Sequence, residues 1–430
     1  MKKILVILYY WPPSGGAGVQ RGVYFVKYLR SFGWEPVVYT PENPDFDIKD
    51  QTLLKKVAPD ITVLKKPIWE PYSIYRKLLG KKAGNVNTGF ISGTKDQGLL
   101  KRLSVWIRGN FFIPDPRKFW VRPSVKYLSN YITEHKIETI FTSGPPHSMH
   151  LIGLGLKKKH PHLKWVSDFR DPWTNIDFYK ELMLSNFADK RHHKLEKDVL
   201  QSADAITVVG GSMKAEFEAK TKRPVYLIPN GFDEEDVQLD DVEMDQHFTI
   251  SHIGTLNSAR NPKNLWKVLG ELCRKDEGIK NALQIQLIGK VEDSVFHAIK
   301  EAGLEEQLKH ISYLPHHEAI RKQQGSQVLL LLINDSPNAK GILTGKFFEY
   351  LAARRPILGI GPEDGDAAGL LTETGAGAMA NYSDEEKMKS IVKQFYSHYL
   401  SGNLTVKPSE VSRFSRRALT EKLSQVLNQL

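Results

Sequence analysis

Short apolar runs alternate along the chain with longer segments in which apolar residues recur every three or four positions. Continuous runs of strand length are typical of strands buried on both faces, and the longer period is typical of amphipathic helices. The pattern predicts βαβ units that build parallel sheets. In the first half the expected strands are residues 3–9, 35–40, 61–65, 139–142, 164–167, 204–209 and 225–228.

A second α/β series follows a strong turn signal at Asn230-Gly231. Residues 232–245 hold eight acids and no base, which marks a boundary between domains. A chain of 430 residues is also too long for one ordinary core. We expect two Rossmann-like, doubly wound domains facing a central cleft, over residues 1–230 and 231–414. Residues 415–430 form a closing helix that could pack back on the first domain.

Residues 327–361 contain the most informative stretch. Two apolar runs flank a Gly-punctuated loop and a helix that begins near Thr344, whose hydroxyl can cap it. A helix start of this kind presents free N–H groups and suits a phosphate, with Lys346 adding charge. Glu349, one turn further on, could bind a ribose diol. The stretch indicates a nucleotide-diphosphate cradle, and the alternative is an ordinary strand–loop–helix unit with a solvated Lys–Glu pair.

The loop after the first strand carries Gly15, Gly16 and Gly18 and leads into a helix. Its glycine spacing differs from the G-x-G-x-x-G fingerprint, and no acidic residue closes the second strand. This argues against a dinucleotide site for hydride transfer. The loop can still bind a ligand at the carboxyl edge of the sheet.

Charge is unevenly distributed along the chain. Residues 1–230 carry 37 Lys and Arg against 21 Asp and Glu, whereas residues 231–430 carry 23 against 28, giving +11 overall. A basic half could face a phosphorylated substrate, an anionic membrane surface or nucleic acid. The single Cys273 excludes an internal disulfide and favours the cytoplasm. No stretch approaches the roughly 20 apolar residues of a membrane span.

Residues 67–120 form a basic and irregular insertion. Within it Leu99, Leu103, Trp106 and Phe111 or Phe112 could share a helix face, beside basic residues. Such a helix suits a membrane interface. The alternative is a helix packed on its own domain with a solvated basic rim.

Five pieces of the sequence occur in the order known from one enzyme family. They are the Gly-rich loop after the first strand, SDFRDPW, IPNGFD, HIGTL and GKFFEYLAARRPIL. In this order they resemble GT-B glycosyltransferases, most of all the retaining family-four enzymes of polysaccharide and lipopolysaccharide assembly. The resemblance covers nearly the whole chain. It implies transfer of a sugar from a nucleotide-diphosphate donor on the second domain to a lipid-linked or glycan acceptor on the first.

On the donor side the resemblance assigns Arg260 and Lys346 to the diphosphate, with Lys263 as a further candidate. It assigns Glu349 to the ribose. No metal or other cofactor is expected, because positive groups and helix N-termini replace a metal at the leaving diphosphate. The resemblance also implies that the backbone around Gly289 and Leu314 surrounds the nucleotide base.

Near the reacting carbon, the resemblance implies that Gly16 and Gly18 approach the donor phosphate and sugar across the cleft. His147, or Asp168 and Arg170, would lie on the acceptor side. We expect the His147 side chain to point into the cleft, with a pKa lowered by the helix dipole. The alternatives are a capping or surface histidine, and an ion-pair cluster of Asp168, Arg170 and Asp171 that only holds the loop.

One position departs from the family pattern. The first of the family's two glutamates would fall at position 341, which here is Gly341. Sugar recognition must therefore differ, and the N–H groups of Gly341, Ile342 and Leu343 are the candidates to replace it. Retention of anomeric configuration remains a hypothesis from the resemblance.

Three other functions compete with glycosyl transfer at the cytoplasmic membrane face. A sugar-nucleotide epimerase would use the same fold, but would need an additional acid or histidine at the sugar. A non-catalytic nucleotide-sugar-binding homologue is suggested by Gly341. Nucleic-acid binding is suggested only by the pI of 9.3, and the sequence contains no recognised binding module.

Overall fold

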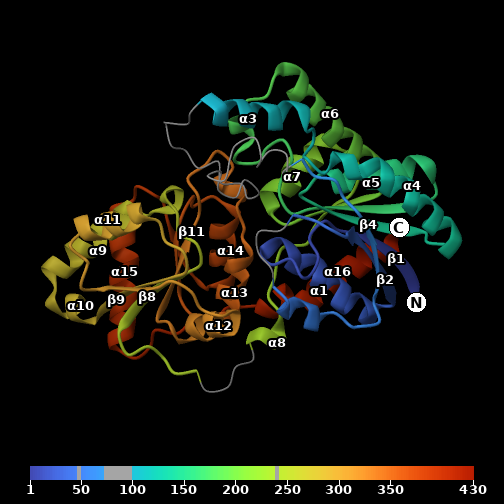
Figure 1. Cartoon of the computed structure of the whole chain (residues 1–430). Helices are drawn as coiled ribbons and strands as arrows, with labels where there is room; N and C mark the ends of the chain where they lie inside the picture. Colours follow the sequence, from blue (N-terminus) through green and yellow to red (C-terminus); the bar gives the residue numbers. More distant parts are fainter. Residues whose placement is uncertain (46–49, 72–98, 238–241) are drawn as a thin grey trace. The chain divides into compact units, whose positions relative to one another are not determined.

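The computed structural model describes residues 1–45, 50–71, 99–237 and 242–430. These residues form two compact units (Figure 1). Unit 1 comprises Met1–Pro229 and Arg416–Leu430, and unit 2 comprises Asn230–Ser415. Each unit contains one parallel sheet covered by helices, which confirms the predicted fold class. Residues 72–98 of the predicted insertion lie outside the described residues.

Unit 1 contains a seven-stranded sheet in the order β3-β2-β1-β4-β5-β6-β7, with every neighbouring pair parallel. The chain builds outward from β1 to β3 and then returns to the other side of β1, so the strand order reverses between β1 and β4. The strands are β1 (Lys2–Ile7), β2 (Trp34–Pro41), β3 (Thr62–Lys66), β4 (Thr139–Gly144), β5 (Lys164–Phe169), β6 (Ala205–Val208) and β7 (Val225–Leu227).

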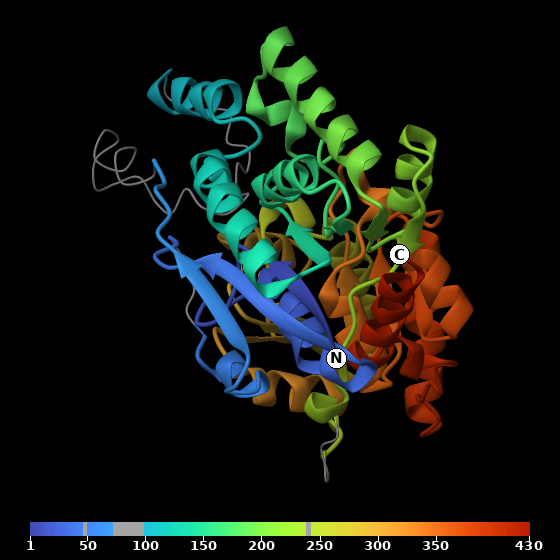
Figure 2. The same ribbon diagram turned by 90° about the vertical axis from the view of Figure 1, so that its right-hand side faces the viewer.

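Helices cover both faces of this sheet because successive residues of a strand point to opposite sides. Leu5 and Ile7 of β1 join one core with helices α4 and α5, while Ile4 and Val6 join the other with α1 and α16. Figure 2 shows α4 and α5, in teal, against the blue strands. The helices are α1 (Ala17–Leu29), α3 (Leu99–Phe111), α4 (Lys118–His135), α5 (Ser148–Lys159), α6 (Asn186–Ser202), α7 (Gly211–Lys220) and α16 (Arg416–Gln429), with short 3₁₀ turns η1 (Arg30–Phe32), η2 (Thr52–Lys56) and η3 (Tyr179–Leu182).

Helix α16, from the end of the chain, completes unit 1. It lies beside α1 (Figure 1), and its Leu419, Leu423 and Val426 are buried in the same core as α1. The chain thus leaves unit 1 after Pro229 and returns to it at Arg416.

Unit 2 contains a six-stranded parallel sheet in the order β10-β9-β8-β11-β12-β13, which reverses between β8 and β11. Along β11, Val328, Leu330 and Leu332 face one core and Leu329 and Leu331 the other. The strands are β8 (Phe248–Ile253), β9 (Leu283–Ile288), β10 (Leu308–Ile311), β11 (Val328–Leu332), β12 (Ile357–Ile360) and β13 (Gly377–Ala380).

The helices of unit 2 are α8 (Glu234–Val237), α9 (Lys263–Lys275), α10 (Glu277–Ala282), α11 (Asp293–Glu301), α12 (His316–Gly325), α13 (Gly345–Ala353), α14 (Asp366–Thr374) and α15 (Glu385–Leu400), with 3₁₀ turns η4 (Ser258–Arg260), η5 (Ala339–Gly341) and η6 (Val411–Phe414). In the described part of the chain, no helix is both long and apolar enough to cross a bilayer.

A buried ion pair connects three segments of unit 1. The Arg21 guanidinium of α1 donates to both oxygens of Asp168 at the end of β5, with the shortest distance 2.7 Å. The same guanidinium donates to the Pro229 carbonyl at 2.9 Å, where the chain leaves the unit. Asp168 also accepts from Ser143 Oγ at 2.7 Å and Thr207 Oγ1 at 2.6 Å, so β4, β5 and β6 share one carboxylate.

Asp168 remains charged despite having no exposed surface. Burial acts to raise the pKa of Asp168, but the Arg21 charge and the hydrogen bonds from Arg21, Thr207 and Ser143 outweigh it and hold the pKa below its ordinary value. Removal of this carboxylate would leave the Arg21 charge buried without its partner.

We predict that Asp168→Ala destabilises unit 1 by about 3–5 kcal/mol, the usual cost of breaking a buried ion pair. The effect should be measured by hydrogen exchange of the β4, β5 and β6 amides, since a two-unit chain need not unfold in one transition. The control is Asp60→Ala, which removes a surface partner of Arg30 and should leave exchange unchanged. Equal exchange in the two variants would contradict the prediction.

Candidate functional site

The strand reversal of unit 2 positions the predicted donor residues. Helices α9 and α13, which follow β8 and β11, pack on opposite faces of the sheet, and in open α/β sheets the crevice expected at such a reversal of the carboxyl edge is where ligands bind. Arg260 lies in the loop after β8, and its Nε donates to Asn334 Oδ1 in the loop after β11. That bond holds the two loops together over the point where the strand order reverses.

Lys346 lies against the backbone of this crevice. A Cβ placed on Gly254 would lie 2.4 Å from Lys346 Nζ, and one placed on Gly289 would lie 2.8 Å from the Gly254 carbonyl oxygen. Both glycines also have φ in the left-handed range, +127° and +120°. Only glycine suits these two positions, because a side chain at either would displace the lysine or the neighbouring strand end.

The electrostatics of this crevice favour an anion. Burial and, to a smaller extent, the Arg260 charge together lower the pKa of Lys346 to about 8, against the opposing effect of Glu349. The lysine thus lies close to a second cation with only one carboxylate nearby. An anion bound here would relieve the repulsion between Lys346 and Arg260 and stabilise the protonated lysine.

Helix α13 adds backbone donors to the crevice. The first N–H groups of a helix have no acceptor within the helix. Our expectation that the Thr344 hydroxyl caps α13 is wrong, since Thr344 occupies the N-cap position without a side-chain cap hydrogen bond. The helix start is therefore open to an external acceptor, as a phosphate seat requires.

The loop before α13 corrects a second expectation. The N–H groups of Gly341 and Ile342 donate to the carbonyls of Asn338 and Ala339, which closes the 3₁₀ turn η5. These two donors are already used, so they do not replace the missing glutamate in the way the sequence suggested. Leu343 is buried in the apolar core of unit 2. Donor binding by the Leu343 N–H stays a prediction, as does any contact of the donor with Gly341 and Ile342 that does not use their N–H groups.

The remaining donor candidates lie around the same edge of the sheet. Glu349 is half-buried and accepts from Gln323 Nε2 at 3.2 Å. Leu314 is half-buried in the loop after β10, and Lys263 is exposed in the first turn of α9. The roles of these residues in binding ribose, base and phosphate stay predictions.

His252 was missed by the sequence analysis, although it stands in the HIGTL motif. Its ring is buried, Nδ1 lies 3.0 Å from the Leu330 carbonyl oxygen, and Nε2 has no hydrogen-bond partner. Burial lowers the pKa of His252 to about 3, with the Lys346 charge contributing in the same direction. A neutral imidazole that donates from Nδ1 to the Leu330 carbonyl has no proton on Nε2, and the ring lies close enough to Lys346 and Arg260 to feel both charges. Its position near the end of the buried strand β8 was the feature of the sequence that could have identified it.

In unit 1, Arg170 ties together the loops after three strands. Its Nη1 donates to the Gly18 carbonyl oxygen at 2.7 Å, and its Nη2 donates to the Pro145 carbonyl oxygen. Burial lowers the pKa of Arg170. Gly16, with φ of +88°, is the N-cap of α1 two residues before Gly18. The structure therefore brings Gly16, Gly18 and Arg170 to the carboxyl edge of the sheet.

Asp168 is not grouped with Arg170 as we expected. Its partner is Arg21, and each carboxylate oxygen already accepts hydrogen bonds from within unit 1. This arrangement is that of a positioning ion pair, and it differs from the alternative that the sequence left open, a cluster of Asp168 with Arg170 and Asp171. A catalytic role for Asp168 or Arg170 stays a prediction.

His147 is more enclosed than its sequence context suggested. The ring stacks on Trp173, with centroids 4.6 Å apart, and only 8% of the residue is exposed. Burial is the main reason that the pKa of His147 is lowered, so the expected helix-dipole cause is wrong. Asp115 occupies the start of α5 instead, accepting from the backbone N–H and hydroxyl of Ser148. The Nδ1 atom of His147 is buried without a partner.

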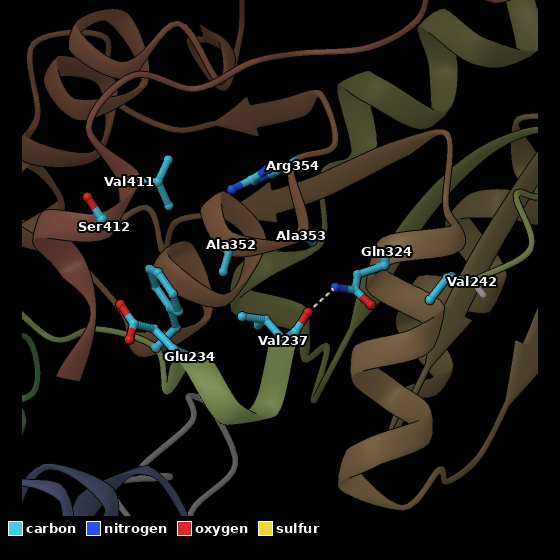
Figure 3. A pocket seen from close by; sticks show the side chains of 10 residues that line it. Glu234, Val237, Val242, Gln324, Ala352, Ala353, Arg354, Val411 and Ser412 are labelled. Atoms are coloured by element: carbon cyan, nitrogen blue, oxygen red, sulfur yellow. Dashed lines mark hydrogen bonds between the residues drawn. The ribbon is translucent and has the colours of Figure 1, made fainter. Parts of the chain in front are cut away.

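A separate hollow of about 530 Å³ lies in unit 2 at the other end of α13 (Figure 3). Ala352, Ala353 and Arg354 line it from that end, and Gln324 Nε2 donates to the Val237 carbonyl oxygen at its wall. None of the predicted site residues lines this hollow. Within residues 1–45, 50–71, 99–237 and 242–430, no three His, Cys, Asp or Glu side chains are grouped to hold a metal ion.

Comparisons with known proteins agree with this architecture. Residues 89–236 match the model of Glycosyltransferase Family 4. No curated protein sequence matches the chain. Solved structures match over nearly its full length, and at identities of 12% and below the likeness concerns the fold.

Three of these structures illustrate the likeness. HepE of Anabaena, in complex with UDP-glucose, has 12% identity and a TM-score of 0.60, with 100% of both chains covered. WaaG, a glycosyltransferase involved in lipopolysaccharide biosynthesis, has 11% identity and a TM-score of 0.55, covering 98% of this chain and 99% of that one. A putative UDP-N-acetylglucosamine 2-epimerase from Listeria monocytogenes has 12% identity and a TM-score of 0.56, covering 100% and 96%.

The fold is thus GT-B, and the resemblance to family-four glycosyltransferases is confirmed. The match over residues 89–236 and the fold both support a glycosyltransferase.

The lowered pKa of Lys346 predicts that this lysine is acylated at a lower pH than an ordinary lysine. At pH 8 about half of Lys346 is neutral and reactive, against roughly 1% or less of an ordinary lysine. Acylation of the protein followed over pH 7 to 10 by mass spectrometry should give a midpoint near 8 for Lys346. Lys267 is the control, because its hydrogen bond to Glu385 raises its pKa. A midpoint near 10 for Lys346 would show that the lysine is not held in the crevice as described.

Proposed function

We propose that this protein transfers a sugar from a nucleotide-diphosphate sugar to a lipid-linked or polysaccharide acceptor, with retention of configuration and without a bound metal. The observation that carries the proposal is the cationic crevice of unit 2. There Arg260, Lys346 and the open start of α13 converge at the strand reversal. This is the chemistry that a diphosphate requires.

The same groups would assist the reaction at the leaving diphosphate. When the bond between the anomeric carbon and the diphosphate oxygen breaks, negative charge develops on that oxygen. Lys346, Arg260 and the α13 N–H groups stabilise it in place of a metal. The acceptor hydroxyl forms the new glycosidic bond, and its proton passes to the departing diphosphate. Glu349 holds the ribose, and His252 supports the crevice from below.

Unit 1 is the proposed acceptor side. Its loops after β1, β4 and β5 are joined by Arg170, and the half of the chain that forms it carries the excess of basic residues. A lipid-linked acceptor brings phosphates and anionic lipid close to the protein, which suits this charge. We therefore propose a role in cell-surface polysaccharide or lipopolysaccharide synthesis at the cytoplasmic side of a membrane. The buried free thiol of Cys273 is consistent with that compartment.

We predict that Arg260→Ala and Lys346→Ala each weaken nucleoside-diphosphate binding by about 1.5–3 kcal/mol, because each removes a charge-assisted hydrogen bond. Thermal shifts with UDP, GDP, ADP and dTDP first identify the nucleoside diphosphate that stabilises the protein. Its affinity for each variant is then measured by calorimetry in EDTA. Lys267→Ala is the control, since this lysine pairs with Glu385 on the surface. If both variants bind the nucleoside diphosphate as tightly as the wild type, Arg260 and Lys346 do not belong to the donor site.

We predict that the product keeps the anomeric configuration of the donor and forms equally well in EDTA. Proton NMR of the anomeric signal, followed from the first turnover with the selected donor, gives the configuration directly. An inverted product would overturn the retaining mechanism but not the donor site. Epimerised donor without transfer would favour the epimerase, whose fold this chain shares. Binding without any turnover would favour a non-catalytic homologue.

A further inference from the structure

Helix α3 presents its apolar stripe to solvent. Leu103, Trp106, Ile107 and Phe111 share one face of the helix and are 52%, 38%, 36% and 58% exposed. Val105, on the opposite face, and Ser104, which borders the stripe beside Phe111, are buried. An amphipathic helix of a globular protein normally turns its apolar stripe inward. The orientation of α3 is the reverse.

Contacts near the C-terminal end of α3 attach the helix to the rest of unit 1. A Cβ on Gly109 would lie 2.5 Å from the Leu182 carbonyl oxygen, so the α3 backbone packs directly on η3. Asn110 Nδ2 donates to the Met183 carbonyl oxygen at 3.2 Å, and Asn110 Oδ1 accepts from the Ser185 N–H at 2.7 Å. Both views show α3 alongside α6 at the periphery of unit 1 (Figures 1 and 2). Small and polar residues therefore attach the helix, and the large apolar ones remain uncovered.

Further exposed aromatic residues lie near the C-terminal end of α3. Trp69 and Phe119 are 52% and 42% exposed and contact each other edge to face, with centroids 4.8 Å apart. Phe119 also contacts Phe112, with centroids 6.1 Å apart, and Phe112 directly follows Phe111 in the chain. We call this set the α3 surface: Trp69, Leu103, Trp106, Ile107, Phe111 and Phe119.

Basic residues flank the apolar stripe on both sides. At 100° per residue, Arg102 falls just beyond one edge of the stripe and Arg108 beyond the other. Residues 99–111 contain no acid, so the positive charge beside the stripe is not offset within the helix. Aromatic and leucine side chains between two basic edges are the pattern of a helix lying in a lipid interface, where arginines reach the headgroups.

We propose that the α3 surface docks on an anionic lipid bilayer, with α3 lying parallel to it and the six side chains inserted at the headgroup level. A protein partner would need its own acidic rim, whereas an anionic bilayer supplies both the apolar layer and the negative charge. This docking does not depend on the proposed glycosyl transfer, because it requires neither donor nor acceptor.

The test is flotation of the full-length protein with vesicles of phosphatidylglycerol and phosphatidylethanolamine, compared with vesicles of phosphatidylcholine. We expect binding to the anionic vesicles only, weakened by 0.5 M NaCl. Arg102→Gln and Arg108→Gln should each lower the partition by roughly fivefold, the loss expected for one basic residue at an anionic surface. Trp106→Ser with Phe111→Ser should lower it by more than about tenfold.

Matched controls come from elsewhere on the surface. Leu400→Ser removes an exposed apolar residue of unit 2, and Lys158→Gln removes an exposed cation of α5, and both should bind vesicles as the wild type does. Nucleoside-diphosphate affinity in solution should be unchanged in all these variants, which separates failure of docking from failure of the donor site. Brominated lipid should quench the wild-type fluorescence more than that of Trp106→Phe.

Three outcomes would overturn the proposal. One is equal binding to neutral and anionic vesicles, and another is binding that the α3 variants leave unchanged. The third is a lipid-free dimer in light scattering that the same variants convert to monomer, since the α3 surface would then be an interface with a second copy of this chain.

Discussion

The reversal of strand order in each sheet is the constraint on which the rest of the structure depends. In a parallel sheet every strand ends at the same edge, so only a reversal separates two adjacent loops enough to admit a ligand. In unit 2 the reversal occurs between β8 and β11. Arg260 lies there in the loop after β8, and Lys346 lies there in the first turn of α13. The crevice therefore exists because of topology, and its charge comes from a few side chains added to it.

Much of the fold could be predicted from hydrophobic pattern because buried parallel strands are short, continuous and apolar. The apolar runs at β1 and β11 predicted two strands that the structure places inside the two sheets. The sheet edge was less predictable: the sequence pattern predicts a strand over residues 309–314, whereas β10 ends at Ile311, since its pairing with β9 stops there. Apolar character does not show where a partner strand ends, and edge strands have only one partner.

The candidate site could be predicted where the charge of a residue suggests its ligand. It could not be predicted where the packing of distant segments determines the hydrogen-bond partner of a residue. Lys346 and Arg260 could be named from charge and position. Sequence could not show that Asp168 would pair with Arg21, which is 147 positions away, or that the N–H groups of Gly341 and Ile342 would be used within η5. His252 was overlooked because its importance comes from an unpartnered ring nitrogen, which only the packed strand reveals.

The return of the chain to unit 1 has a consequence for the order in which the protein forms during synthesis. Unit 2 is a continuous segment that ends at Ser415, whereas unit 1 lacks α16 until the residues after Ser415 have been made. The unit encoded first is thus the last to be completed. Until then, the core face of α1 that α16 will cover stays open, and a nascent chain carries an apolar surface through the synthesis of all of unit 2.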